Sequence, residues 1–119
     1  MDPDGGAPRL RLHVTKADPD HTTIVLSGRF DAVEAMAVRE RMAEADLVAA
    51  RHLVFDLTDV GFLDSAGLAV LVRARRDRVR AGGSVALVRP ASEDAMRVLR
   101  LTRFDEIFTM VDGRTRGAT

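Results

Sequence analysis

The sequence has no cysteine, no tryptophan and no tyrosine. Without cysteine the chain can form no disulfide, thiol nucleophile or thiolate metal site, which agrees with a reducing compartment. Without tryptophan and tyrosine, a surface that stacks nucleic-acid bases could draw only on 5 Phe and 3 His. The 18 basic residues balance the 18 acidic ones, so the net charge gives no general attraction to nucleic acid.

Long apolar runs are also missing. No run approaches the ~20 residues that cross a bilayer as a helix. The first ten residues, MDPDGGAPRL, lack the basic start and apolar stretch of a signal peptide. We therefore expect a cytoplasmic protein that does not enter a membrane. A length of 119 residues fits one domain, and we place it at 9–112, after a disordered leader (1–8) and before a flexible tail (113–119).

The apolar pattern changes between the period of a strand and that of a helix. Leu10, Leu12 and Val14 alternate with polar residues, which predicts a half-buried strand. Asp31 and Ser92 are typical helix caps. The predicted strands are 10–15, 23–27, 53–57, 85–88 and, at an edge, 107–111, and the predicted helices are 32–48, 64–81 and 93–101. The order β-β-α-β-α-β-α-(β) predicts an α/β fold, a small mixed β-sheet with helices packed mainly on one face.

The helical periodicity also predicts which side chains are buried. We expect one face of each helix to carry its apolar residues toward the sheet. These residues are Val33, Met36, Met42 and Ala45 in the first helix, Leu68, Leu71, Val72 and Val79 in the second, and Met96 and Leu99 in the third. In the strand 53–57, the acidic Asp56 is either a hydrogen-bonded core residue or one that faces a cleft.

The turn Asp64-Ser65-Ala66-Gly67-Leu68 opens the second helix and has two interpretations. In the first, Asp64 or Ser65 caps the helix through its side-chain oxygen. In the second, Ser65 is a modification site, because a serine at a helix start points outward. A phosphate there would add about −1.5 to −2 charge without unfolding the domain, but a docked partner would have to bury that charge. The two interpretations are compatible.

Catalysis fits the sequence poorly. A nucleophilic serine needs a base, and the candidates His13, His21 and His52 are scattered along the chain. The turn lacks the Gly-x-Ser-x-Gly elbow, and the histidines have no carboxylate at metal-ligand spacing. We expect no enzymatic activity, no catalytic residue, no metal and no cofactor. The arginine-rich helix segment 73–80 predicts either a solvated face or a docking stripe for an acidic partner.

The run 53–68, LVFDLTDVGFLDSAGL, resembles the signature of STAS domains, and among them the anti-sigma factor antagonists. That signature is a buried strand, a short acidic turn, Asp-Ser-x-Gly-Leu and a helix. The segment 26–31, LSGRFD, is similar to the family's Leu-x-Gly-Glu-Leu-Asp. The pair 82–83 matches its helix–strand junction, and 99–108, LRLTRFDEIF, is similar to its closing segment. The resemblance covers about residues 10–112.

The resemblance implies a partner-switching cycle. An unphosphorylated antagonist binds an anti-sigma factor that is also a serine kinase, the kinase phosphorylates the antagonist, and a serine phosphatase reverses this. The matching acceptor is Ser65, and the implied partner-binding residues are Asp31, Asp64, Ala66, Gly67 and Leu68. No direct contact with nucleic acid or membrane is implied. The alternative is a STAS module of a transport or sensory assembly without a phosphate cycle.

Three positions depart from the family pattern. Arg29 stands where the family often has an acid, which could change the kinase that is recognised. Arg103 stands where it often has glycine, which indicates a different helix ending. Ala66 replaces a common second serine, so Ser65 is the single acceptor in this turn.

Overall fold

The computed structural model describes residues 9–18 and 20–113, so the predicted leader and most of the predicted tail lie outside the described residues. The strands form one sheet in the order β1-β2-β3-β4-β5, in which β1 is antiparallel to β2 and the other neighbours are parallel. The elements are β1 Arg11–Asp18, β2 His21–Phe30, α1 Ala32–Met42, α2 Ala45–Val48, β3 His52–Leu63, α3 Ser65–Arg80, β4 Ser84–Val88, α4 Glu93–Leu101, α5 Phe104–Ile107 and β5 Thr109–Val111. This confirms the predicted α/β fold and element order, with α2 and α5 as additions.

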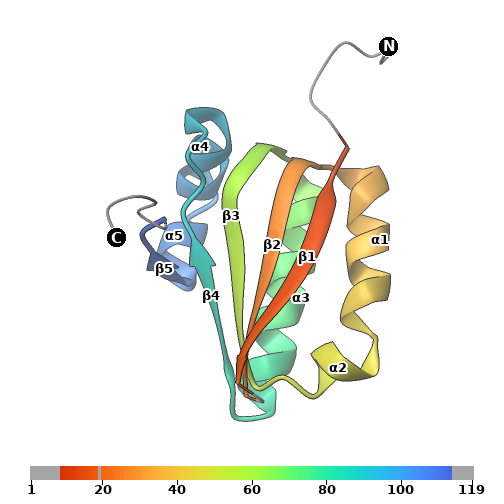
Figure 1. Cartoon of the computed structure of the whole chain (residues 1–119). Coiled ribbons are helices and arrows are strands. Elements are labelled where there is room, and N and C mark those ends of the chain that lie inside the picture. The colour runs from red at the N-terminus through yellow and green to blue at the C-terminus, as the bar shows by residue number, and fades with distance from the viewer. Residues whose placement is uncertain (1–8, 19, 114–119) are drawn as a thin grey trace.

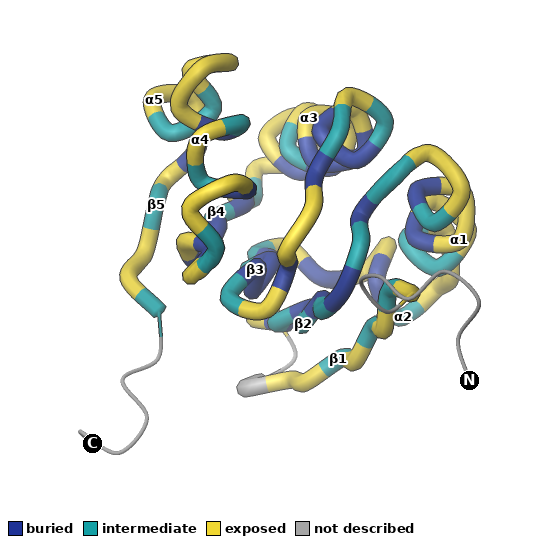
Figure 2. The backbone as a smooth tube through the Cα atoms, turned by 90° about the horizontal axis from the view of Figure 1, so that it is seen from above, coloured by how far each residue is buried: buried dark blue, intermediate teal, exposed yellow. Residues whose placement is uncertain are grey.

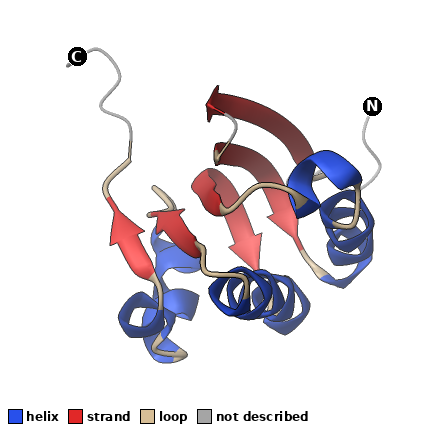
Figure 3. Cartoon of the chain, turned by 90° about the horizontal axis from the view of Figure 1, so that it is seen from below, coloured by secondary structure: helices blue, strands red, loops and turns tan. Residues whose placement is uncertain are grey.

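The helices cover mainly one face of the sheet. Figure 1 shows the strands side by side, and Figure 3 shows the strands and helices as separate layers. Figure 2, seen along the sheet, shows that the buried parts of α1 and α3 face the strands. Right-handed crossovers place successive helices on the same face when the strand order does not reverse, and here it does not.

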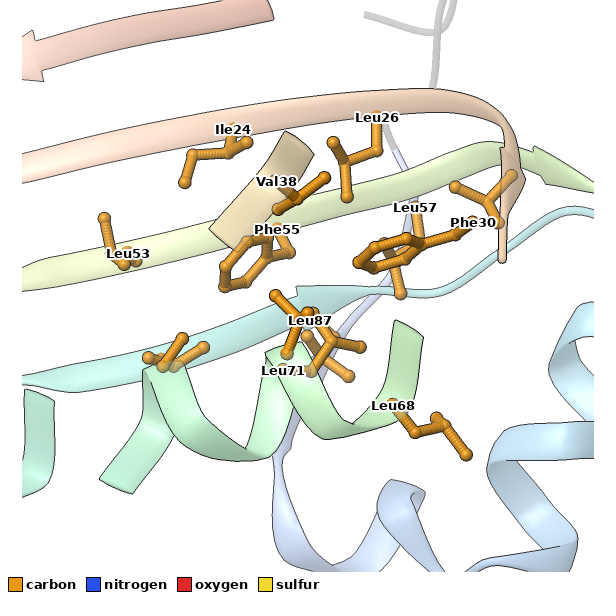
Figure 4. Packing of buried hydrophobic residues seen from close by; sticks show 14 of the residues in the cluster. Ile24, Leu26, Phe30, Val38, Leu53, Phe55, Leu57, Leu68, Leu71 and Leu87 are labelled. Carbon is orange, nitrogen blue, oxygen red and sulfur yellow. The ribbon is translucent and has the colours of Figure 1, made fainter. Parts of the chain in front are cut away.

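The core lies between the sheet and these helices. Residues of β2 alternate between buried and half-buried, as the period of two requires. Ile24 and Leu26 of β2 and Phe55 of β3 are fully buried, and Leu71 of α3 packs against the same cluster (Figure 4). At one edge of the sheet, β1 pairs with β2 alone among the described strands.

The first predicted helix is divided in two, and its predicted apolar face is wrong except at Met42, which packs partly against the core, whereas Ala45 is exposed. It ends at Met42, and the chain resumes as the short α2. Arg41 bonds to both Glu44 and Asp46 across the break, with N···O distances of 2.8 Å. The change of direction brings Leu47 into the core. The side chains that α1 buries are Ala35 and Val38, whereas Val33 is 70% and Met36 63% exposed.

The buried stripe of the second helix was predicted in part. Leu68 and Leu71 are buried, but Val72 and Val79 are 39% and 50% exposed. The other residues that α3 buries against the domain are spaced one turn apart, namely Val70, Ala74 and Arg78. In α4, Leu99 is buried as predicted, and Met96 packs only partly against the core.

The two central strands extend further than predicted. β3 continues through the segment 59–63, predicted as a connection, because that segment pairs with the end of β2. β2 passes Gly28, which has a φ of 105°, and ends at Phe30. The edge strand β5 is confirmed at Thr109–Val111. The helix α5 precedes it, after Arg103 with a left-handed φ of 63°.

Candidate functional site

The ends of β2 and β3 bring the two predicted site segments to one edge of the sheet. These strands are parallel, and their last residues, Phe30 and Leu63, are paired. Each strand is followed at once by a helix, so the helix starts at Asp31 and Asp64 share this edge. The backbone N–H of Asp64 donates to the Phe30 carbonyl at 3.4 Å, which links the two starts. Asp31 and Asp64, which the resemblance implies as partner-binding residues, therefore lie at the same edge of the sheet.

Asp64 caps α3, and Ser65 is left free. The Asp64 carboxylate accepts from the N–H groups of Ala66 and Gly67 at 3.0 and 3.2 Å. Of the two residues considered as caps, the structure selects Asp64. Ser65 is the first residue of α3 and is exposed, and its hydroxyl makes no hydrogen bond within the described residues. That hydroxyl is therefore exposed to solvent.

Gly67 lets the first turn of α3 approach the end of β2. A Cβ atom at this position would lie 2.6 Å from the Phe30 carbonyl oxygen and 3.0 Å from the side chain of Leu63. Gly67 and Leu68 are buried, so the close approach that the glycine permits here is internal. The contact of Gly67 and Leu68 with a partner stays a prediction. Because both residues are buried, a partner at this turn would touch their neighbours, such as the half-buried Ala66.

Asp31 is held by its own helix and by a cation. Its carboxylate accepts from the Glu34 N–H at 3.1 Å and from Arg29 Nε at 3.3 Å. The Glu34 hydrogen bond, followed by the Arg29 guanidinium, holds the pKa of Asp31 below its ordinary value. Arg29 also lies over the Phe62 ring, with 4.0 Å from its guanidinium carbon to the ring centroid. Arg29, one of the positions that depart from the family pattern, therefore lies at the same edge of the sheet as Asp31.

A hollow of about 630 Å³ lies beside Ser65, between α1 and α3. Its lining includes the exposed apolar side chains of Met36 and Val72. Three arginines also line it, Arg39, Arg73 and Arg76. A docking stripe is one of the two predicted roles of the arginine-rich segment 73–80, but the sequence pattern does not predict the wall from α1. Met36 belongs to that wall, whereas the helical periodicity predicts it as a core residue.

The other candidate residues lie away from this edge. His21 and His52 begin β2 and β3, at the opposite ends of these strands, with their rings stacked at a centroid distance of 4.9 Å. His13 lies within β1, opposite Val25. Within the described part of the chain, no three His, Asp or Glu side chains are grouped as a metal site requires.

Asp56 is a hydrogen-bonded acid in the interior. It is 5% exposed, and its Oδ1 accepts from the N–H and the hydroxyl of Thr58 at 3.0 and 2.6 Å. Of its two interpretations, the structure favours the core role.

No helix within residues 9–18 and 20–113 is long and apolar enough to span a membrane.

Comparison with known proteins finds relatives with similar descriptions. An anti-sigma-B factor antagonist of Listeria monocytogenes is 28% identical over 110 residues, which cover 91% of this chain and 96% of the relative. A protein of the same description from Listeria innocua matches equally. An anti-sigma factor antagonist structure from Mycobacterium paratuberculosis has a TM-score of 0.74 at 25% identity, covering 92% of this chain and 91% of that one.

The fold also matches the anti-sigma factor antagonist SpoIIAA. Its unphosphorylated form has a TM-score of 0.75 at 17% identity, covering 91% of this chain and 92% of that one. Its phosphorylated form, from Bacillus, has a TM-score of 0.70 at 18% identity, with coverage of 91% and 96%. The sequence pattern of the family described as STAS domain matches residues 13–115. The chain belongs to the STAS domain family.

Proposed function

We propose that this protein is an anti-sigma factor antagonist whose binding is switched off by phosphorylation of Ser65. The observation that carries the proposal is the exposed Ser65 hydroxyl at the start of α3, free of hydrogen bonds to described residues because Asp64 supplies the cap. The names of the Listeria relatives support this function. The protein acts as a binding module in the cytoplasm and has no catalysis of its own.

The charge at this edge explains why a single phosphate is sufficient. The unmodified edge carries the carboxylates of Asp64 and Asp31, each engaged by backbone N–H groups at a helix start. A phosphate on Ser65 adds about −1.5 to −2 charge next to Asp64. In the free domain this charge is solvated and lies at the positive end of α3, so the fold tolerates it. A docked partner would have to desolvate it, and the complex dissociates.

The same geometry supports a docking surface at this edge. We assign its exposed and half-buried centre to Asp31, Asp64, Ser65 and Ala66. Gly67 and Leu68 support this centre from inside, because they set the position of the first turn of α3. The partner is an anti-sigma factor with serine kinase activity, and a serine phosphatase restores the binding form. No direct contact with nucleic acid is part of the cycle.

The first experiment tests the acceptor. The purified chain is incubated with the anti-sigma factor kinase of the same organism and ATP, and bound phosphate is counted by intact-mass spectrometry. We expect one phosphate on the wild type and none on Ser65→Ala. Ser84→Ala is the matched control, because Ser84 is also exposed but begins β4, at the opposite edge of the sheet. Equal phosphorylation of Ser65→Ala would show that the acceptor is elsewhere.

The second experiment tests the switch. Ser65→Asp should weaken kinase binding at least tenfold in a titration, because a third carboxylate enters the docking surface beside those of Asp31 and Asp64. Its urea unfolding midpoint should stay close to that of the wild type, since an acid in the first turn of a helix is favourable. Unchanged kinase binding by Ser65→Asp contradicts the switch. A pull-down that recovers transporter subunits and no kinase would support the STAS module of a transport or sensory assembly.

A further inference from the structure

A groove separates α1 and α2 from the second half of α3. Its volume is about 840 Å³, within the range of about 300–1,000 Å³ typical of small-molecule sites. Val70 and Ala74 of α3 form its floor, and Met36, Met42 and Val48 contribute to its walls. Met36 and Val48 are 63% and 59% exposed although they are apolar. The groove therefore offers an open apolar surface with a small-residue floor.

One wall of this groove holds a buried cation. Arg78 is 7% exposed, and burial lowers the pKa of its guanidinium. Its Nη2 donates to the Leu47 carbonyl at 2.5 Å, whereas its Nε is buried without a hydrogen-bond acceptor among the described residues. No carboxylate of the described residues forms an ion pair with it, and Asp77 acts on it only through a Coulomb interaction. A buried cation without a hydrogen-bonded counter-ion is unfavourable, so an anion in the groove would gain a partner in Arg78.

A purely structural role explains only part of this arrangement. The Leu47 carbonyl, near the end of the short α2, already accepts the backbone N–H of Ala50 at 3.2 Å. Arg78 gives that carbonyl a second hydrogen bond with one of its five N–H donors. A methionine or leucine would fill the space without burying a charge, and the bond to Leu47 leaves the buried Nε unused.

The remaining charges along the groove favour the same sign of ligand. Four arginines and two acids contribute to its lining, namely Arg39, Arg51, Arg73, Arg78, Glu40 and Asp77. The lining therefore has an excess of positive charge, although the chain as a whole has a formal net charge of zero. Local positive potential in a concave apolar site attracts anions.

We propose that this groove binds an organic anion with a carboxylate head, which pairs with Arg78, and an unbranched apolar tail. The tail lies over Val70 and Ala74, between the side chains of Met36 and Met42. The path along α3 from Val70 to Arg78 is about 12 Å at 1.5 Å per residue, the length of an extended chain of about ten carbons. Ser65 does not line this groove, although Met36, Arg39, Val70 and Arg73 line both the groove and the hollow beside Ser65. Binding of the anion requires neither a phosphate nor a protein partner.

The test uses decanoate and the full chain, labelled on its methionine methyl groups and observed by NMR. We expect saturable shifts of the Met36 and Met42 methyl signals that fit one site. Decanol and decylammonium keep the tail but lack the negative head, so both should bind at least tenfold more weakly. Shifts of the same size at the same concentration of decylammonium overturn the proposal, since the head would then have no role. Absence of saturable decanoate binding overturns it as well.

Substitutions locate the site. Met36→Glu places a negative charge in the groove wall and should weaken decanoate binding at least tenfold. Val33→Glu is the matched control, because Val33 is equally exposed on α1 but does not line the groove, and its affinity should stay within twofold. Arg78→Gln should abolish the preference for decanoate over decanol. If Arg78→Gln does not fold, the Met36 and Val33 variants decide, and equal affinities for these two overturn the proposal.

Discussion

Replacing Gly67 with alanine tests how closely the first turn of α3 is held against β2. At an ordinary helical position this change stabilises a protein by about 1 kcal/mol, because alanine is the better helix former. Here the new Cβ would lie 2.6 Å from the Phe30 carbonyl oxygen. That is about 0.8 Å short of ordinary van der Waals contact, and the nearest atom belongs to the backbone.

The domain has little room to relieve this contact. The Phe30 carbonyl accepts the N–H of Asp64, and Phe30 itself is fully buried and paired with Leu63. Moving α3 outward would loosen the core contacts of Leu68 and Leu71. Overpacking of this kind costs about 1–3 kcal/mol. We therefore expect Gly67→Ala to lower the free energy of unfolding by about 1–3 kcal/mol, the opposite sign to the propensity effect.

Urea unfolding followed by far-UV circular dichroism measures this change, because the chain has no tryptophan or tyrosine for fluorescence. Gly61→Ala is the matched control. A Cβ at Gly61 would meet nothing within 4 Å, so this variant should be as stable as the wild type or more stable by up to about 1 kcal/mol. Equal midpoints for Gly67→Ala and wild type would refute the argument that this glycine sets the position of Ser65.

Three further predictions concern stability. Asp64→Ala removes the cap of α3 and should lower the free energy of unfolding in urea by about 1 kcal/mol; an unchanged midpoint would mean that solvent replaces the cap. Arg103→Gly should raise the free energy of unfolding by about 1 kcal/mol, because Arg103 has a left-handed φ of 63° that glycine adopts without strain. A lower free energy of unfolding would contradict this prediction. The hydrogen bond from Arg41 lowers the pKa of Asp46 to about 2, below the value of about 3.9 in an unfolded chain. The stabilisation from the Arg41–Asp46 pair is therefore complete above pH ~4 and is lost between pH ~4 and ~2. In urea unfolding at decreasing pH, the stability of Asp46→Asn should decline less than that of the wild type. Parallel declines of the two proteins would refute this prediction.

The order of elements could be predicted because local signals agreed with the tertiary structure. The alternation in β2 and the caps Asp31 and Ser92 act within a few residues, and each is where the pattern placed it. Helix faces were less predictable, because periodicity alone does not say which of two apolar stripes meets the sheet. In α3 the small Ala74 and the charged Arg78 are buried while Val79 is exposed.

The candidate site shows the same division. The turn around Ser65 was found because its residues are adjacent in sequence. The choice between Asp64 and Ser65 as the cap depends on the backbone geometry at the end of β3, which the sequence does not express. The wall of the hollow comes from α1, about thirty residues earlier in the chain. Only the packing of α1 against α3 brings Met36 and Arg39 beside Ser65.

The position of β1 at the edge of the sheet has a consequence for solubility. Its 8 residues are long enough to template a further strand, and the open backbone edge of such a strand promotes aggregation. The exposed side chains of Arg11 and Lys16 lie near its two ends. Two copies that joined through antiparallel β1 strands would bring these cations toward one another, and like charges across strands destabilise the pair. The edge therefore discourages the domain from extending its sheet with a second copy of itself.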